Sequence, residues 1–167
     1  WDNDCKAYAI DNFTFDMFSS EKVFHPQVKQ FLEDLLTTFR IKDKIEIINK
    51  DIAKVTRKDI KEDLADVVYY DASLEIKDIQ SAVKNILPLT TINSILIFSN
   101  TQNLEALAAF EKAITTNLAI IHYSLELKSR VIADTNTWWN GVKIFVIERK
   151  MLANEVIDKQ KELKNNV

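Results

Sequence analysis

The residues that could carry chemistry are few in this chain. Histidine occurs only as His25 and His122, and Cys5 is the only cysteine. A lone cysteine can form neither an internal disulfide nor a cysteine-based zinc site. The chain has no His-Glu-x-x-His motif, and Lys22 and Ala119 stand where a di-iron bundle would need a Glu three residues before a His. These absences exclude zincin and di-iron chemistry, so we expect no metal and no cofactor.

Glycine sets a second limit on function, because Gly141 is the only one in the sequence. Neither a phosphate-cradling loop nor a dinucleotide fingerprint can be built with a single glycine. A cysteine–histidine nucleophile pair would need Cys5 to meet a histidine, and nothing in the sequence orients them. With these catalytic sets missing, the sequence predicts a protein that is not an enzyme.

Binding residues are easier to nominate than catalytic ones. His122 stands four residues before Glu126, a helical spacing that would allow a metal site, a pH-sensitive contact or a simple hydrogen bond. Trp138 and Trp139 are adjacent, and neighbouring helix residues point about 100° apart, so one indole should lie at a boundary or in a groove. We expect a ligand or partner to contact a group of aromatic and histidine side chains: Trp138, Trp139, His122, Tyr123, Phe13, Phe15 and Phe18.

Charge and hydropathy patterns argue against two kinds of partner. The net charge is −3, with a pI of about 5.5. The one basic cluster interleaves with acids (Lys54, Arg57, Lys58 and Lys61 among Asp51, Asp59 and Glu62). Nucleic acid is therefore not an expected partner, because its binding sites need uncompensated positive charge. The longest apolar region, 86–98, is too short for direct membrane insertion.

Composition and capping signals favour helices. The chain is 47% hydrophobic with one glycine and two prolines, which disfavours folds rich in turns. Pro26 is a plausible first helical residue, and Thr56–Asp59 and Ser99–Gln102 match the capping-box pattern. Pro88 should kink or end a helix whose inner face includes Ile79 and Val83.

The apolar spacing is typical of long helices. Ile41, Ile45, Ile48, Ile52 and Val55 follow one another at steps of four and three, as in a seam between two helices. A second long helix is expected to open at the Ser99–Gln102 capping box and to run to about residue 131, and a last one is expected from about 138. Residues 89–98 are rich in β-branched side chains and alone could form a strand. We expect a helix there, because no second segment alternates at period two to pair with it.

The sequence thus predicts an all-α fold. We expect an elongated antiparallel helical bundle of about four to six helices over residues 26–167, with an aromatic N-terminal arm over residues 1–25 packed on it. The expected core residues are Leu107, Ile114, Leu118, Ile121, Val142, Phe145 and Leu152.

A bundle without catalytic residues is expected to work by binding. The partner would be an apolar, lipid-like small molecule held between the helices, or another protein. The alternative is an extracytoplasmic sensor or secretion-machinery domain of a larger membrane-associated protein. The start at Trp1 suits a mature product or a fragment, and Asn12-Phe13-Thr14 matches a glycosylation acceptor. We therefore expect a secreted or extracytoplasmic location, with a cytoplasmic one left open.

Overall fold

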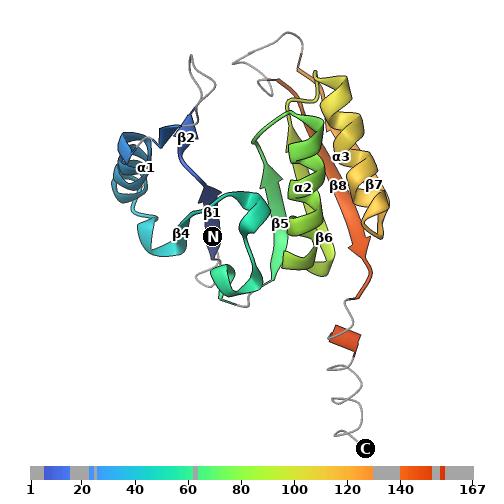
Figure 1. Cartoon of the computed structure of the whole chain (residues 1–167), viewed down its shortest axis with the longest axis horizontal. Helices are drawn as coiled ribbons and strands as arrows, with labels where there is room; N and C mark the ends of the chain where they lie inside the picture. The colour runs from blue at the N-terminus through green and yellow to red at the C-terminus, as the bar shows by residue number, and fades with distance from the viewer. Residues whose placement is uncertain are drawn as a thin grey trace, which may run out of the picture. The chain divides into compact units, whose positions relative to one another are not determined.

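The chain folds as a mixture of helices and strands, and not as a helical bundle (Figure 1). The computed structural model describes residues 6–15, 23–24, 26–61, 64–129, 140–151 and 155–156. The Cα trace divides into two compact units, residues 1–62 (unit 1) and 63–167 (unit 2). The all-α prediction is therefore wrong, because segments taken for buried helices pair as strands in both units.

Unit 1 is built around a short parallel strand pair. β1 pairs with β4 in a register that places Tyr8 opposite Glu46. The described elements are β1 (Ala7–Asp11), β2 (Thr14–Phe15), β3 (Val23–Phe24), α1 (Pro26–Thr38), β4 (Ile45–Asn49) and the 3₁₀ helices η1 (Lys42–Lys44), η2 (Ile52–Lys54) and η3 (Arg57–Ile60). The predicted helix start at Pro26 is confirmed. The predicted helical seam is wrong, since its central residues form β4.

Unit 2 contains a four-stranded sheet in the order β5-β6-β8-β7. β5 and β6 are parallel, and β8 runs antiparallel to both of its neighbours, β6 and β7. The elements are β5 (Ala65–Tyr70), α2 (Ile76–Ile86), the 3₁₀ helix η4 (Leu87–Leu89), β6 (Thr90–Ser99), α3 (Leu104–Thr116), β7 (Ala119–Leu127) and β8 (Val142–Arg149). As predicted, the helix before Pro88 ends there, and Ile79 and Val83 are buried on its inner face.

The core of unit 2 lies between the sheet and the two helices α2 and α3, which cover one of its faces (Figure 1). Four aromatic rings fill its centre. The Phe110 ring lies 4.8 Å from Phe98, 5.5 Å from Tyr70 and 5.8 Å from Phe145 between centroids. Aromatic side chains bury large apolar areas, and such pairs add about 0.5–1.5 kcal/mol each beyond that burial. This cluster fixes β5, β6 and β8 against α3.

Residues 90–99 form β6, one of the two central strands of this sheet, which corrects the helix predicted for 89–98. The missing partner is β8, whose residues were assigned to the last predicted helix. Alternate side chains of β6 (Ser94, Leu96 and Phe98) are buried under the helices, as expected for a strand with one face covered. β-branched composition was the correct signal here.

The long helix predicted to open at Ser99–Gln102 is also wrong. α3 ends at Thr116, Leu118 takes a left-handed conformation (φ 65°), and β7 follows. Leu107, Ile114 and Phe145 are buried as predicted, whereas Leu118 is 59% exposed. Ile121 and Val142 are only half-buried, and Leu152 lies outside the described residues. Among the residues that the structure describes, no helix is long and apolar enough to span a membrane.

Candidate functional site at the carboxyl ends of two parallel strands

Two polar turns meet where β5 and β6 end. The strands are parallel, with Tyr70 opposite Phe98, so Asp71 follows one strand beside the end of the other, Ser99. In open α/β sheets, ligands bind outside the carboxyl ends of the strands. This edge is therefore the first place to look for a site in unit 2.

The polar side chains at this edge form a connected network. The Ser99 hydroxyl donates to Asp71 Oδ1 at 2.6 Å, and the Asn100 amide donates to the same oxygen at 3.2 Å. That amide also donates to Ser99 Oγ at 2.9 Å, and Asn140 Nδ2 donates to Asn100 Oδ1 at 2.7 Å. We call Asp71, Ser99, Asn100 and Asn140 the carboxyl-edge cluster. Ser99 is buried and Asp71 is exposed, so the network leads from the core to solvent.

The single glycine of the chain lies beside this cluster. Gly141 has φ +83°, and a Cβ there would lie 2.2 Å from Thr101 Oγ1. The Thr101 and Gln102 amides donate to the carbonyls of Gly141 and Asn140 at 3.5 and 3.3 Å. Only a residue without a side chain allows the turn after β6 to approach the start of β8 this closely. Gly141 thus places Asn140 against Asn100.

Local hydrogen bonds also fix the two turns. The Tyr70 hydroxyl donates to the Ser73 carbonyl at 2.8 Å, and the Ser73 hydroxyl donates to Asp78 Oδ2 at 2.8 Å. The side chain of Asn103 caps α3 by accepting from the Ala106 amide at 3.0 Å. The capping residue of α3 is therefore Asn103, four positions after the predicted Ser99.

Burial and nearby carboxylates affect the two tyrosines that end β5. Burial raises the pKa of Tyr70 to about 12, and the Asp78 charge acts in the same direction. Partial burial and the Asp71 carboxylate also raise the pKa of Tyr69, against an opposing hydrogen bond with Ser99. Both phenols therefore stay neutral at physiological pH and can act only as hydrogen-bonding groups there.

The chemistry open to the carboxyl-edge cluster is recognition of a polar ligand. Asp71 Oδ2 accepts no hydrogen bond from the described part of the chain. Its position in an exposed carboxylate leaves it available to a ligand hydroxyl or ammonium group. Over the same part of the chain, no three His, Cys, Asp or Glu side chains are grouped as they would be around a metal ion.

The side chains nominated from the sequence are spread over both units. Phe13 is buried in unit 1 and has φ 51°. His122 and Tyr123 are exposed on β7, and His122 contacts Glu148 of β8 at 2.8 Å rather than Glu126. Phe15 lies in β2. Phe18, Trp138 and Trp139 lie outside the described residues, so the binding role of the nominated group stays a prediction.

Sequence reasoning missed the carboxyl-edge cluster. Ser99 was taken as the start of a capping box, and Asp71 was not among the nominated binding residues. The available signal was the position of both residues directly after runs of apolar and β-branched side chains, 67–70 and 95–98. Two such runs, each followed by a short polar side chain, are typical of parallel strands with a ligand site at their carboxyl ends.

Comparison with known proteins identifies the fold. No family model and no curated protein matches the sequence. Among solved structures, a SAM-dependent O-methyltransferase from Thermotoga maritima matches 88% of this chain and 51% of its own length, with TM-score 0.59 and 13% identity. An O-methyltransferase from Bacillus cereus in complex with SAH matches 86% and 74%, with TM-score 0.57 and 10% identity. Mitomycin 7-O-methyltransferase matches 87% and 49%, with TM-score 0.53 and 15% identity.

These neighbours share a Rossmann-like α/β fold with this chain. At such low identity the likeness concerns the fold, and the chain spans about half the length of two of the three proteins. It corrects the expectations of a non-enzymatic binding bundle, of a lipid-like or protein partner between helices, and of a sensor or secretion domain built from long helices.

Proposed function

We propose that this chain carries an S-adenosylmethionine-dependent methyltransferase domain, with the carboxyl-edge cluster as part of its cofactor site. The observation that carries the proposal is the position of Asp71 and its hydrogen-bonded partners at the carboxyl ends of β5 and β6. The structural neighbours support it, since several are named for this activity.

The donors and acceptors of the cluster suit this cofactor. S-adenosylmethionine has ribose hydroxyls and an ammonium group that donate hydrogen bonds. Asp71 Oδ2, which accepts none from the described residues, is an acceptor for them. The Asn140 amide nitrogen donates to Asn100 Oδ1 at 2.7 Å, which holds Asn140 within the cluster. When bound, the cofactor would supply an electrophilic methyl group on its sulfonium.

The shortage of glycine does not conflict with this ligand. Glycine-rich turns are needed where the backbone must approach a pyrophosphate, and S-adenosylmethionine has no phosphate. At the end of β1 the Phe13 amide already donates to Asp11 Oδ1 at 2.6 Å. That amide is therefore not offered to a ligand, and the contacts we propose come from the β5–β6 edge.

Binding of S-adenosylhomocysteine, the stable demethylated product, tests the proposal without knowledge of the methyl acceptor. We expect isothermal titration calorimetry to detect binding to the wild-type chain. Asp71→Asn should weaken binding about tenfold or more, because hydrogen bonds to charged groups contribute about 1.5–3 kcal/mol.

Asp66→Asn is the matched control, because Asp66 is also exposed but lies at the opposite end of β5, where it accepts from Thr91 Oγ1 at 3.1 Å. This variant should bind like the wild type. A wild-type chain that binds neither S-adenosylhomocysteine nor S-adenosylmethionine would overturn the proposal, as would equal losses in the two variants.

A further inference from the structure

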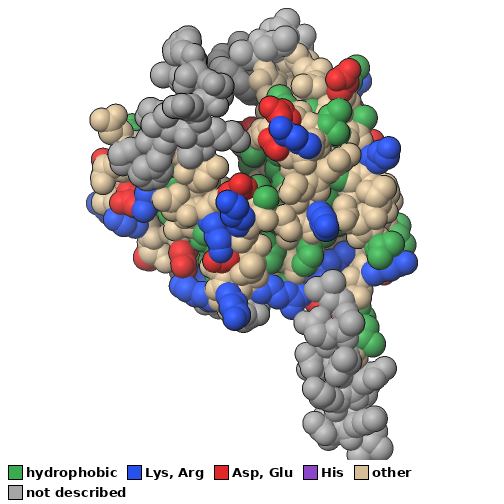
Figure 2. Space-filling model, in the orientation of Figure 1, with side chains coloured by type: hydrophobic (Ala, Val, Ile, Leu, Met, Phe, Trp, Pro, Cys, Tyr) green, Lys and Arg blue, Asp and Glu red, His purple; other side chains and the backbone are tan. Residues whose placement is uncertain are grey.

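Positive charge is concentrated in residues 40–61 of unit 1. This segment has eight Lys and Arg residues against four Asp and Glu, a net charge of +4, in a chain whose total is −3. Figure 2 shows Lys and Arg side chains along the edge of the molecule where β4 and the 3₁₀ helices lie. The described part of the chain offers no ion-pair partner to five of these cations: Arg40, Lys42, Lys44, Lys54 and Lys58.

The acids of the same segment are mostly engaged in local structure. Asp59 accepts from Lys50 Nζ at 2.9 Å through both carboxylate oxygens and from the Thr56 amide at 2.7 Å. Glu46 forms an ion pair with Lys61, and Asp51 caps η2. Asp51 and Asp59, two of the acids that argued against a polyanion partner, are therefore engaged elsewhere than with these five cations. Glu62 lies outside the described residues, and Asp43 lines the pocket described next, beside Lys42 and Lys44.

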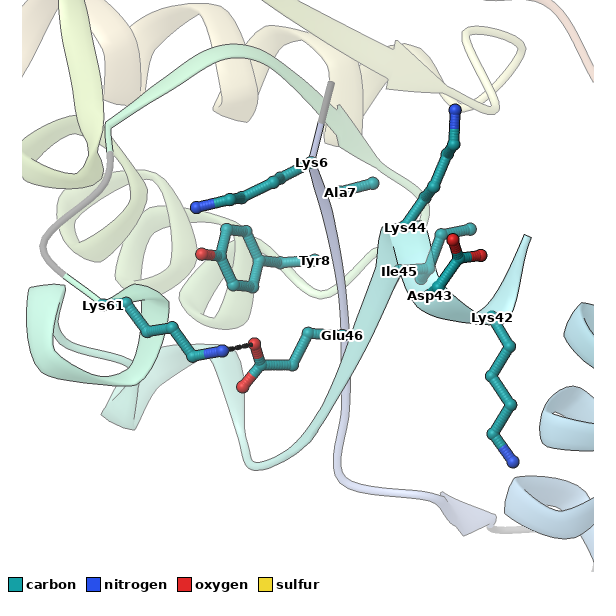
Figure 3. Close-up of a pocket in the computed structure, with 9 residues that line it drawn as sticks. All are labelled: Lys6, Ala7, Tyr8, Lys42, Asp43, Lys44, Ile45, Glu46 and Lys61. Carbon is teal, nitrogen blue, oxygen red and sulfur yellow. Dashed lines mark ion pairs between the residues drawn. The ribbon is translucent and has the colours of Figure 1, made fainter. Parts of the chain in front are cut away.

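A pocket of about 320 Å³ opens within this basic region. Its walls come from β1, η1, β4 and the end of η3. Figure 3 shows Lys6, Tyr8, Glu46 and Lys61 on one side, with Lys42 on the other. The Tyr8 hydroxyl donates to the Ile60 carbonyl at 3.1 Å, which holds the aromatic ring in place. Ligand pockets span about 300–1,000 Å³, so this one would accommodate a small unit such as a single nucleotide.

We propose that this pocket binds single-stranded nucleic acid, with backbone phosphates on Lys42 and Lys44 and a base against the Tyr8 ring. Proteins that bind single strands combine a basic groove with aromatic side chains on which bases stack. Both features are present on the walls of one pocket here. An acidic protein or an anionic membrane would bind to the positive charge alone and would not need the fixed Tyr8 ring. The inference is independent of the proposed methyltransferase function.

Fluorescence anisotropy with labelled twelve-nucleotide oligo-U and oligo-dT tests this inference on the full chain. Binding should weaken as salt rises. Lys42→Ala/Lys44→Ala should reduce the magnitude of the slope of log K against log salt by about 1.4, because each phosphate neutralised on a single strand accounts for about 0.7. Tyr8→Leu should weaken binding about tenfold, and Tyr8→Phe should retain most of it, because the stacking face remains.

Lys84→Ala/Lys112→Ala is the matched control. It removes the same charge from exposed positions on α2 and α3, and it should leave affinity and salt slope unchanged. The inference fails if the wild type binds neither oligonucleotide, if both double variants weaken binding equally, or if vesicles containing phosphatidylserine bind the chain and the oligonucleotides do not. Circular dichroism of each variant separates a binding defect from a folding defect.

Discussion

Within the described residues, five positions other than glycine adopt a left-handed backbone conformation. Phe13, Arg40, Lys61, Asn100 and Leu118 have φ between 51° and 65°. Several follow the end of an element, as Lys61 follows η3, Asn100 follows β6 and Leu118 follows α3. At Phe13 the Asp11 carboxylate accepts the backbone amide and supports the turn. Glycine is the usual sequence marker of such positions, so these element ends had no clear signal in the sequence.

Gly141 is where a residue-scale change should be most costly. Gly141→Ala introduces a Cβ 2.2 Å from Thr101 Oγ1 and places alanine at φ +83°. We expect a loss of about 2–4 kcal/mol in the free energy of unfolding, from left-handed strain and overpacking together. Urea denaturation followed by circular dichroism measures this loss.

A rescue experiment separates the two causes. Thr101→Ala/Gly141→Ala removes the close contact but keeps the strained φ, so it should recover part of the stability. If Gly141→Ala costs less than about half a kcal/mol, the approach of the two turns described above is wrong.

Apolar periodicity fails as a guide to element type in this chain because several of its strands are short and are bounded by helices. The steps of four and three from Ile41 to Val55 match a helical seam, yet they cover η1, β4 and η2. Short apolar runs cannot be assigned by spacing alone. Local signals were more reliable: Thr56 and Asp59 bond to one another at the start of η3, and Pro26 begins α1, both as predicted. Pairing between β6 and β8 depends on residues about fifty positions apart, which no local pattern reports.

The end of α3 gives an element-scale prediction. Ile114 is fully buried and Leu118, four residues later, is 59% exposed. Ile114→Ala should lower the free energy of unfolding by about 2–5 kcal/mol, through the transfer energy of the deleted atoms and the cavity left behind. Leu118→Ala should change it by less than about half a kcal/mol. Both values come from urea titrations of the single variants.

Leu118→Gly provides a test of the opposite sign. A glycine just past the end of a helix relieves left-handed strain, so this variant should be more stable than the wild type by about 1 kcal/mol. A large loss of unfolding free energy in either Leu118 variant would contradict the end of α3 at Thr116. It would support the continuous helix that we expected from the sequence.

Both units use parallel strand pairs whose connections include a helix. β1 and β4 have α1 between them, and β5 and β6 are joined through α2. Parallel strands need crossovers of a dozen or more residues, so their pairing is absent from any short window of sequence. Apolar runs that alternate with helical segments along the chain indicate parallel strands joined by helices. We missed this indication because we interpreted the apolar runs as helices. The candidate site was missed for the same reason, since Asp71 and Ser99 come together only through the pairing of β5 with β6.

The acid stability of the chain should report on unit 1 through one ion pair. The Lys50 ammonium and hydrogen bonds from Thr56 lower the pKa of Asp59 from 3.8 to about 2. Between these two values the unfolded chain binds a proton that the folded chain does not, so protonation favours unfolding. The stabilisation from this carboxylate is therefore fully present above about pH 4 and declines as the pH falls toward 2.

Hydrogen exchange measured by mass spectrometry between about pH 2 and pH 6 locates this effect, after correction for the intrinsic pH dependence of exchange. Asp59→Asn should reduce protection of residues 45–61 at the upper pH but not at the lower one, and Lys50→Met should do the same because it removes the partner. Peptides from β6, in unit 2, serve as the internal control and should match the wild type at each pH. If Asp59→Asn lowers protection equally at both ends of the pH range, the pair does not couple proton binding to folding.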